Sequence, residues 1–352
     1  MTTDRRGPGD AEADHFGADH AGADHARAGH AGTVESAQGG AVQDRRRDDW
    51  LTPDGQSVDH PTHVLAHLSD THLTSAGIRY NGVIDADAAL DRAVAVLRAA
   101  VAEGRRIDAV VVSGDLTDSG DPDAYHRLEA AFGRVDLEGG AGIRLVFATG
   151  NHDVRRQFHR HLLRLGDTDD TDGPSLQVQA VRGLRIIVLD STVPGHGHGR
   201  LLPEHLDALR DELRTPAEAG TVVVLHHAPL PPPSPLLSYF ALETHSRRAL
   251  AAAVAGTDVR LILAGHHHLP QSGMLGAVPV AVAGSTAIRT DPMGAAGHER
   301  TFQDAAFNLV ELFVDTVTVS VVPVSDAPVV FDLDAAGCRA VIDAHPVDAE
   351  PR

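Results

Sequence analysis

The stretch "IDAVVVSGDL", residues 107–116, decides the fold, because an uninterrupted apolar run ends there in serine, glycine and aspartate. A strand that is apolar at successive positions is buried on both faces, as in sheets covered by helices. The residues before it, 85–104, and after it, 120–133, are expected helices with recognisable end signals. A buried strand between two helices predicts an α/β fold.

Both expected helices carry residues that favour a start or a stop at their ends. Asp85 can cap the first helix, and Gly104 lies just past its end. Asp121 can cap the second helix, and Pro122 occupies its first position, where no N–H is needed. These signals fix the two helices on either side of the central strand.

Apolar strands continue along the chain to about residue 325. The last two are joined tightly at Asp315, as in a hairpin. Because strands become denser toward that end, we expect mixed rather than purely parallel sheets. The further elements expected are strands within 62–70, 143–153, 184–191, 221–229, 259–268, 278–285, 307–314 and 316–324, and helices after Pro203 and near 243–255.

The two ends of the chain differ from this pattern. Residues 1–60 have almost no large apolar side chains, so they cannot offset the entropy of ordering, and we expect a disordered tail. Histidines recur there every five residues, as a metal-scavenging arm or as a low-complexity extension without a preformed site. Residues 327–352 show no clear period and stay an unassigned tail. The recurring histidines are His15, His20, His25 and His30.

The composition argues against several classes of protein. A net charge of −19 disfavours a nucleic-acid partner held by a basic surface. A nucleotide substrate stays open, because a bound metal can invert the local field. Cys338 is the single cysteine, which excludes an internal disulfide and fits a reducing compartment. No signal peptide or apolar stretch of membrane-spanning length is visible, so we expect a cytoplasmic protein without a membrane span.

Side chains of metal-ligand types follow five apolar strands at the point where each strand ends. In α/β sheets, sites form outside the carboxyl ends of the strands, so these residues should meet at one rim. Singly they have ordinary explanations, since a lone aspartate caps a turn and a lone histidine hydrogen-bonds in a core. Their coincidence at five strand ends predicts a metal site instead. The residues are Asp70, His72, Asp115, Asn151, His152, Asp153, His226, His227, His266, His267 and His268.

The donor set suggests two metals rather than one. Two carboxylates, one amide oxygen and four imidazoles exceed the four ligands of a tetrahedral zinc site. They suit two adjacent cations with one carboxylate bridging. The absence of a nearby cysteine disfavours a structural thiolate site. Two cations about 3.5–4 Å apart are the usual device for displacement at phosphorus, so phosphate-ester chemistry is predicted.

These motifs resemble those of the calcineurin-like metallophosphoesterases over about residues 62–325. The family's D-x-H, G-D, G-N-H-D, H and G-H-x-H occur in order as "SDTH", "SGDLTDSGD", "TGNHD", "LHHAP" and "AGHHH". The segments "YNGVIDAD" and "LRIIVLDSTVPGHGHG" narrow the resemblance to class III cyclic nucleotide phosphodiesterases. The resemblance implies a four-layer sandwich over residues 61–326, with two mixed sheets face to face and helices outside. It also suggests a homodimer.

The resemblance further implies which residues hold each metal. Asp115 would bridge the two metals together with a hydroxide. The family's metals are commonly iron and manganese, and zinc, cobalt and magnesium are the other candidates. One metal would be held by Asp70, His72, Asp115 and His268, and the other by Asp115, Asn151, His226 and His266.

One histidine in these motifs is not a ligand in the family. His152 would hydrogen-bond the phosphate and protonate or stabilise the leaving O3′. Asp153 beside it either orients His152 or a metal ligand, or caps a turn. His196 and His198 lie on a glycine-rich loop, where they either reach the substrate or are exposed without a role.

The three consecutive histidines 266–268 need a geometric argument. Residues two apart point the same way if the chain stays extended beyond the strand. His266 and His268 would then each reach one metal, while His267 points away. By the same logic His226 is the expected ligand and His227 supports it from behind.

Together, these observations and the resemblance predict a metal-dependent phosphodiesterase that hydrolyses 3′,5′-cyclic nucleotides. Cyclic AMP would be converted to 5′-AMP by in-line attack of the bridging hydroxide. Broader action on 2′,3′-cyclic nucleotides, or nucleotide pyrophosphatase activity, is an alternative. A non-catalytic metal-buffering protein that uses the His-rich tail is an alternative of another class. Removing residues 1–59 separates the two classes, because an enzyme keeps its turnover and a buffer loses most of its metal capacity.

Overall fold

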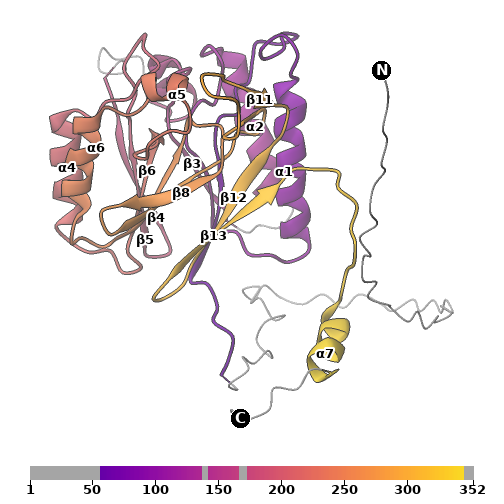
Figure 1. Cartoon of the computed structure of the whole chain (residues 1–352). Helices are drawn as coiled ribbons and strands as arrows, with labels where there is room; N and C mark the ends of the chain where they lie inside the picture. The colour runs from indigo at the N-terminus through magenta and orange to yellow at the C-terminus, as the bar shows by residue number, and fades with distance from the viewer. Residues whose placement is uncertain (1–55, 137–141, 166–172, 345–352) are drawn as a thin grey trace, which may run out of the picture. The chain divides into compact units, whose positions relative to one another are not determined.

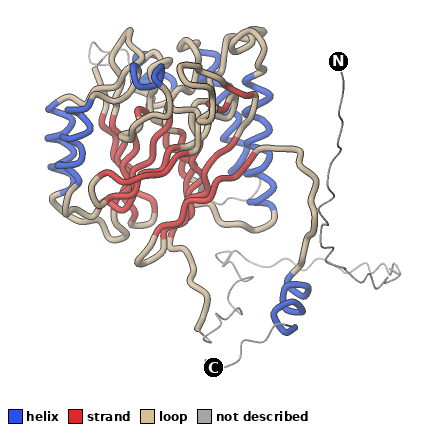
Figure 2. The backbone as a smooth tube through the Cα atoms, viewed as in Figure 1, coloured by secondary structure: helices blue, strands red, loops and turns tan. Residues whose placement is uncertain are grey.

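The computed structural model describes residues 56–136, 142–165 and 173–344. Within these ranges the strands stand in the middle and helices cover both outer sides (Figure 1). Colouring by secondary structure separates the central strands from the flanking helices (Figure 2). The order of layers is helix, sheet, sheet, helix, which confirms the expected α/β sandwich of two mixed sheets.

The first sheet has five strands in the order β13-β12-β1-β2-β3. β1, β2 and β3 run parallel, while β12 is antiparallel to both β1 and β13. The hairpin expected around Asp315 is the β12–β13 pair. The bounds are β1 His63–Leu68, β2 Ala109–Val112, β3 Arg144–Phe147, β12 Ala306–Leu312 and β13 Val317–Pro323.

The second sheet has six strands in the order β4-β5-β6-β7-β9-β8. Its central strands are parallel and its edge strands, β4 and β8, are antiparallel to their neighbours. A separate two-stranded pair joins β10 Arg289–Thr290 to β11 Thr301–Phe302. The bounds are β4 Leu176–Val181, β5 Leu184–Leu189, β6 Thr221–His227, β7 Val259–Gly265, β8 Gln271–Leu275 and β9 Val278–Val282.

The helices divide between the two outer faces. Side chains of α1 and α2 share a buried cluster with the first sheet, and those of α4 and α6 share one with the second. Figure 1 shows these two pairs on opposite sides of the strands. The bounds are α1 Ala86–Ala102, α2 Pro122–Asp136, α3 Arg155–His161, α4 Pro203–Leu213, α5 Pro235–Tyr239, α6 Thr244–Val254 and α7 Ala335–Ala344.

Strand β2 contains the apolar run of residues 109–112. Val110 and Val112 pack into the cluster beneath the helices, whereas Ala109 and Val111 pack into the cluster between the two sheets. All four are fully buried. Each buried valine contributes roughly 1.5–3 kcal/mol from removing its side chain from water. The strand is apolar at every position because it has no face toward solvent.

The expected helix ends are confirmed where a polar side chain caps them. Asp85 accepts a hydrogen bond from the backbone N–H of Ala88 at 3.0 Å, and Gly104 adopts φ +84° just past α1. Asp121 accepts one from Asp123 N–H at 2.9 Å at the start of α2. The sequence did not predict α3, α5, α7, β4, β8, β10 or β11. Of these, β4 and β8 lie at the edges of the second sheet, and α3, α5, β10 and β11 are short.

The terminal predictions meet the structure only in part. Residues 1–55, with the recurring histidines, lie outside the described residues. The unassigned C-terminal stretch contains α7, which Asp334 caps by accepting a hydrogen bond from Gly337 N–H at 2.8 Å. Within the described ranges, no helix combines the length and apolarity needed to cross a bilayer.

A buried histidine in β1 is held in its neutral form. His67 is completely buried, with Nε2 3.0 Å from Ser113 Oγ and Nδ1 3.4 Å from the side-chain nitrogen of Asn308. The amide of Asn308 donates to Nδ1, so a protonated ring would set two donors against each other. Burial lowers the pKa of His67 to about 3.

We expect His67 to make the free energy of unfolding fall as the pH drops below about 6.5. In that range the unfolded chain binds a proton at this residue and the folded chain does not, so stability falls by up to about 1.4 kcal/mol per pH unit. Urea unfolding from about pH 7 to pH 5 measures this slope. His67→Gln removes the titration and should flatten the slope, whereas equal slopes for both proteins would contradict the assignment.

Candidate metal centre

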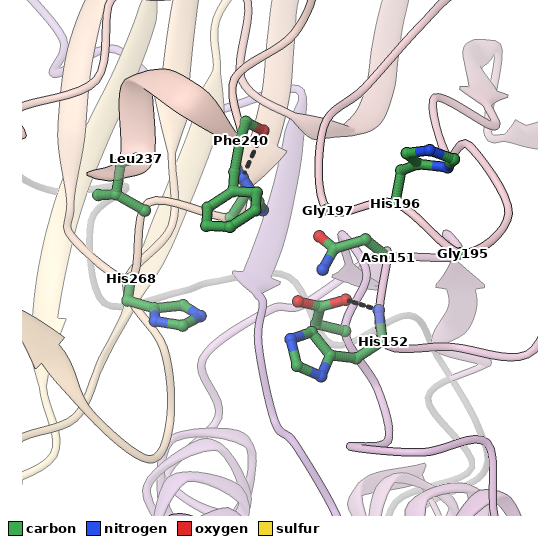
Figure 3. A pocket seen from close by; sticks show the side chains of 10 residues that line it. Asn151, His152, Gly195, His196, Gly197, Leu237, Phe240 and His268 are labelled. Carbon is green, nitrogen blue, oxygen red and sulfur yellow. Dashed lines mark hydrogen bonds between the residues drawn. The ribbon is translucent and has the colours of Figure 1, made fainter. Parts of the chain in front are cut away.

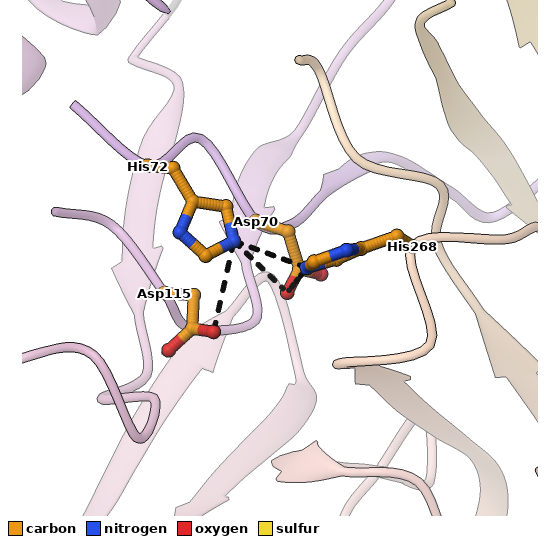
Figure 4. Close-up of side chains that lie close together, drawn as sticks. All are labelled: Asp70, His72, Asp115 and His268. Atoms are coloured by element: carbon orange, nitrogen blue, oxygen red, sulfur yellow. Dashed lines mark hydrogen bonds and ion pairs between the residues drawn. The ribbon is translucent and has the colours of Figure 1, made fainter. Parts of the chain in front are cut away.

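The carboxyl ends of β1, β2 and β7 bring together four side chains, which we call the first cluster: Asp70, His72, Asp115 and His268 (Figure 4). His72 Nε2 lies 3.0 Å from His268 Nε2 and 3.8 Å from Asp115 Oδ2. His268 Nε2 lies 3.2 Å from Asp70 Oδ1. Two nitrogens at about 2.1 Å from one cation and at a right angle are about 3 Å apart, so these imidazoles are spaced like ligands of one metal.

A second cluster, Asp115, His226 and His266, forms where β6 and β7 end. His226 Nε2 lies 3.3 Å from Asp115 Oδ2 and 3.2 Å from Asn151 Oδ1, which adds an amide oxygen to the group. Asp115 belongs to both clusters, and its Oδ2 faces His72 on one side and His226 on the other. The five strand ends of the sequence argument therefore do meet at one rim.

The orientation of individual donors fits metal binding. His226 Nδ1 donates to the carbonyl of Ser113 at 2.9 Å, which leaves its Nε2 as the ligand atom. His266 Nε2 donates to the carbonyl of Phe240 at 2.9 Å, which leaves its Nδ1. Among the described residues, the fully buried Oδ1 of Asp70 has no hydrogen bond of regular geometry, and its neighbour is His268 Nε2 at 3.2 Å. A buried carboxylate oxygen without a regular hydrogen bond is explained by a cation there.

The charges in the two clusters also favour a cation. Burial raises the pKa of Asp70, but His268 beside it outweighs this and lowers that pKa to about 2. Burial likewise opposes ionisation of Asp115, yet His226 holds the pKa of Asp115 well below its usual range. Two buried carboxylates are thus kept anionic among imidazoles. A cation bound here takes the place of imidazole protons, so binding releases protons.

The backbone turns sharply where the ligand-type residues lie. Among the described residues, eight other than glycine have positive φ, and five of these belong to the two clusters. Such conformations are uncommon outside glycine and persist only where the surroundings hold them. Here Asp70 N–H donates to Gly114 O and His72 N–H to Asp115 O, each at 2.9 Å. The five are Asp70, His72, Asp115, His266 and His268.

The prediction that the chain stays extended after β7 is wrong. His266 and His268 are left-handed, with φ +71° and +50°, so the chain bends at each of them instead of staying extended. The two rings still reach different clusters. His267 turns away, as expected, with Nδ1 2.8 Å from Gln271 Oε1. Bends rather than strand periodicity therefore separate the two rings.

His152 lies beside the first cluster and is paired with Asp118, which the sequence argument did not select. His152 Nδ1 lies 3.2 Å from Asp118 Oδ1. Burial works against protonation, but the hydrogen bond to Asp118 and the charge of Asp115 outweigh it and raise the pKa of His152 to about 9. The signal for Asp118 was present, since it is a second carboxylate three residues after Asp115 in "SGDLTDSGD".

Tyr80 is a further neighbour that the sequence argument missed. Its ring stacks on His72, with centroids 4.4 Å apart and planes 11° apart. Tyr80 is buried, and no pattern in the sequence marks it as a partner of His72. The stack fixes the plane of the His72 ring, whose Nε2 faces the other members of the first cluster.

Asp153 hydrogen-bonds to the backbone of its own turn and of the loop after β2, which favours a structural role over orienting His152. Its carboxylate accepts hydrogen bonds from the backbone N–H groups of Gly150, Leu116 and Thr117 at 2.9, 3.1 and 3.0 Å. It also accepts one from Tyr125 Oη at 3.0 Å. Asp153 thus ties the turn that carries Asn151 to the loop after β2.

The hydrogen bonds of His227 go to a nearby loop rather than to His226. His227 Nε2 donates to the carbonyl of Gly197 at 3.1 Å, and its Nδ1 lies 2.9 Å from Ser191 Oγ. The loop separates its two histidines. His196 lines a cavity next to the clusters, whereas His198 lies 3.6 Å from Glu243 and is not among the residues that line it.

The cavity has a volume of about 400 Å³, which is within the range of small-ligand sites. Cluster residues, His152, Leu237 and Phe240 line it, and Figure 3 shows Leu237 and Phe240 across from Asn151 and His152. The loop Gly195–Gly197 closes a third side. A molecule with a phosphate at the clusters therefore extends toward an apolar surface.

We expect Gly150→Ala to reduce metal content and to lower the free energy of unfolding by about 1–3 kcal/mol. A Cβ at this position would collide with the backbone nitrogen and Oδ1 of Asp115. Gly133→Ala, in α2, is the control, because nothing lies within 4 Å of its added Cβ. Metal analysis and urea unfolding compare the two. The same metal content in both variants would contradict the close approach.

The family described as calcineurin-like phosphoesterase matches residues 63–270. The chain belongs to this family, and it is a hydrolase of phosphate esters. This confirms the resemblance expected from the motifs.

Two relatives and one solved structure narrow the picture. The chain is 44% identical over 264 residues to a Rhodococcus erythropolis protein named "Probable cyclic nucleotide phosphodiesterase". The aligned region covers 75% of this chain and 84% of that protein. The chain is 41% identical over 264 residues to the cAMP/cGMP dual specificity phosphodiesterase of Mycobacterium tuberculosis, over 75% of this chain and 80% of that protein. A dimetal phosphatase from Danio rerio shares the fold, with a TM-score of 0.52 and 14% identity over 76% of this chain and 100% of that one.

Proposed function

We propose that the two clusters hold two metal ions that share Asp115. The first ion is bound by Asp70, His72, Asp115 and His268, and the second by Asp115, Asn151, His226 and His266. The observation that carries this proposal is the position of Asp115 Oδ2, 3.8 Å from His72 Nε2 and 3.3 Å from His226 Nε2. Bound there, two cations supply Lewis acidity, which activates water and neutralises charge on a phosphate.

The donor set limits the choice of metal. Oxygen and imidazole donors without thiolate are compatible with iron, manganese, zinc, cobalt and magnesium, so the donors alone do not rank these metals. Iron with manganese is the pair that the family resemblance favours. Elemental analysis of the protein as purified identifies the metals directly.

The reaction proposed is hydrolysis of 3′,5′-cyclic nucleotides, with cyclic AMP converted to 5′-AMP. The names of the two relatives support this class of substrate. The cavity beside the clusters supports it too, because its volume of about 400 Å³ leaves room for a nucleoside beyond the phosphate. The cyclic phosphate would lie at the clusters and the sugar and base toward the apolar side.

His152 is the proposed acid. Asp118 lies 3.2 Å from its Nδ1 and favours the protonated ring, which leaves Nε2 for the substrate. From there it can donate to a phosphate oxygen and deliver a proton to the leaving O3′. Asp118 acts as a positioning residue that holds the ring and its charge.

A substrate panel tests this function. Protein of measured metal content is assayed for kcat/KM on 3′,5′-cyclic AMP, 2′,3′-cyclic AMP and a sugar-nucleotide diphosphate. We expect 3′,5′-cyclic AMP to be hydrolysed to 5′-AMP with the highest kcat/KM. A higher value on the 2′,3′ isomer or the diphosphate would replace the proposal with the broader phosphodiesterase or the pyrophosphatase.

A further inference from the structure

We propose that Leu237 and Phe240 form a binding surface for the nucleobase of the substrate; we call these two residues the α5 wall. The inference rests on the proposed function and extends it to the part of the substrate that does not react. Both side chains line the cavity next to the clusters, and Figure 3 shows them across it from Asn151 and His152. Base binding by this wall would decide how the cyclic phosphate is presented to the clusters.

The short helix α5 has two faces with different surroundings. Leu237 lies in α5 and Phe240 directly follows its last residue; the two are three residues apart, a spacing that places side chains on one face of a helical turn. Leu236 and Tyr239 have the same spacing, lie outside the cavity lining and are 50% and 79% exposed. One apolar pair therefore faces the cavity and a matched apolar pair faces solvent.

Phe240 is held in place before any substrate binds. Its carbonyl accepts the hydrogen bond from His266 Nε2 at 2.9 Å, which links it to the second cluster. Its ring packs on Gly197 so closely that a Cβ there would lie 2.6 Å from Phe240 Cδ1. The ring is thus fixed between the metal-ligand residues and the Gly195–Gly197 loop, and stacking on it costs little ordering.

The chemistry of the lining indicates what the wall binds. An aromatic ring with an aliphatic neighbour suits a flat base, because every base has a π face. Among the described residues that line the cavity, His196 is the one polar side chain besides His152 and the proposed metal ligands. Few groups are therefore placed to read the edges of a base. We expect adenine and guanine to be accepted with similar kcat/KM.

The test compares substrates with and without a base. Wild type, Phe240→Ala and Tyr239→Ala are assayed on 3′,5′-cyclic AMP, 3′,5′-cyclic GMP and the 3′,5′-cyclic phosphate of 1-O-methylribose, which has no base. In Phe240→Ala the preference for cyclic AMP over the abasic compound is expected to fall about tenfold or more, mainly through KM. Phe240→Tyr keeps the ring and should restore the preference, and Tyr239→Ala should retain it.

Binding of products gives a second measurement that does not depend on turnover. Calorimetry with 5′-AMP and with inorganic phosphate should show that Phe240→Ala lowers the affinity for 5′-AMP about tenfold and the affinity for phosphate much less. An unchanged ratio of the two affinities in Phe240→Ala, or an equal change in Tyr239→Ala, overturns the wall. If the wild type binds 5′-AMP through Phe240 but hydrolyses no cyclic nucleotide, the wall stands and the proposed function fails.

Discussion

Asp115→Asn is expected to lower the bound metal from two ions per chain to one or none and to abolish nearly all turnover. Asp115 is the single side chain shared by both clusters, and the change removes its charge while keeping its shape. The loss in kcat should exceed the about 10²–10³-fold cost of removing one donor to a transition state. Elemental analysis and kcat on 3′,5′-cyclic AMP measure the two effects.

Asp108→Asn is the matched control for this variant. Asp108 is also buried, but it precedes β2 at the end opposite Asp115 and pairs with Arg106 and Arg182. We expect this variant to keep two metals and wild-type turnover. If Asp115→Asn still bound two metals and turned over at the wild-type rate, the shared-ligand assignment would be wrong.

His152→Ala is expected to keep its metals and to lose about 10²–10⁴-fold in kcat/KM, the usual contribution of a positioned acid. His152 belongs to neither of the proposed ligand sets and donates its backbone N–H to Asp115 Oδ1 at 2.8 Å, a bond that alanine preserves. The side chain is paired with Asp118 instead. Metal content and kcat/KM on 3′,5′-cyclic AMP are the measurements.

The leaving group separates proton donation from other roles of His152. A p-nitrophenyl phosphodiester expels a weakly basic phenolate that needs no proton. The loss of kcat/KM in His152→Ala should therefore be smaller on this substrate than on cyclic AMP. A parallel loss of metal and activity would instead make His152 a ligand.

The sequence predicts the parts of the fold whose signals are local. Strand β2 is recognisable because buried residues occupy both faces, and α1 because a capping aspartate starts it and glycine follows it. Helix α3 has no side-chain cap hydrogen bond, and α5 is a single turn of Pro235–Tyr239. The edge strand β8 is exposed at alternate positions and lacks a continuous apolar run. These elements depend on tertiary contacts that a sequence pattern does not contain.

The candidate site follows the same division. Residues directly after apolar strands, such as Asp70 and His226, could be predicted to converge, because parallel strands end at one edge. The left-handed conformations of His266 and His268 could not, since they depend on bonds such as that from His266 N–H to Asp70 Oδ2 at 3.0 Å. The contact between Phe240 and His266 joins residues 26 positions apart and has no local signal.

The measurement that tests the central claim most directly is a titration of metal-free protein with Mn²⁺ under assay on 3′,5′-cyclic AMP. Bound metal and formation of 5′-AMP are followed together. Two ions sharing Asp115 predict that turnover stays low while about one equivalent is bound and reaches its maximum at two. Full turnover at one equivalent, or none on cyclic AMP with two metals bound, would contradict the account.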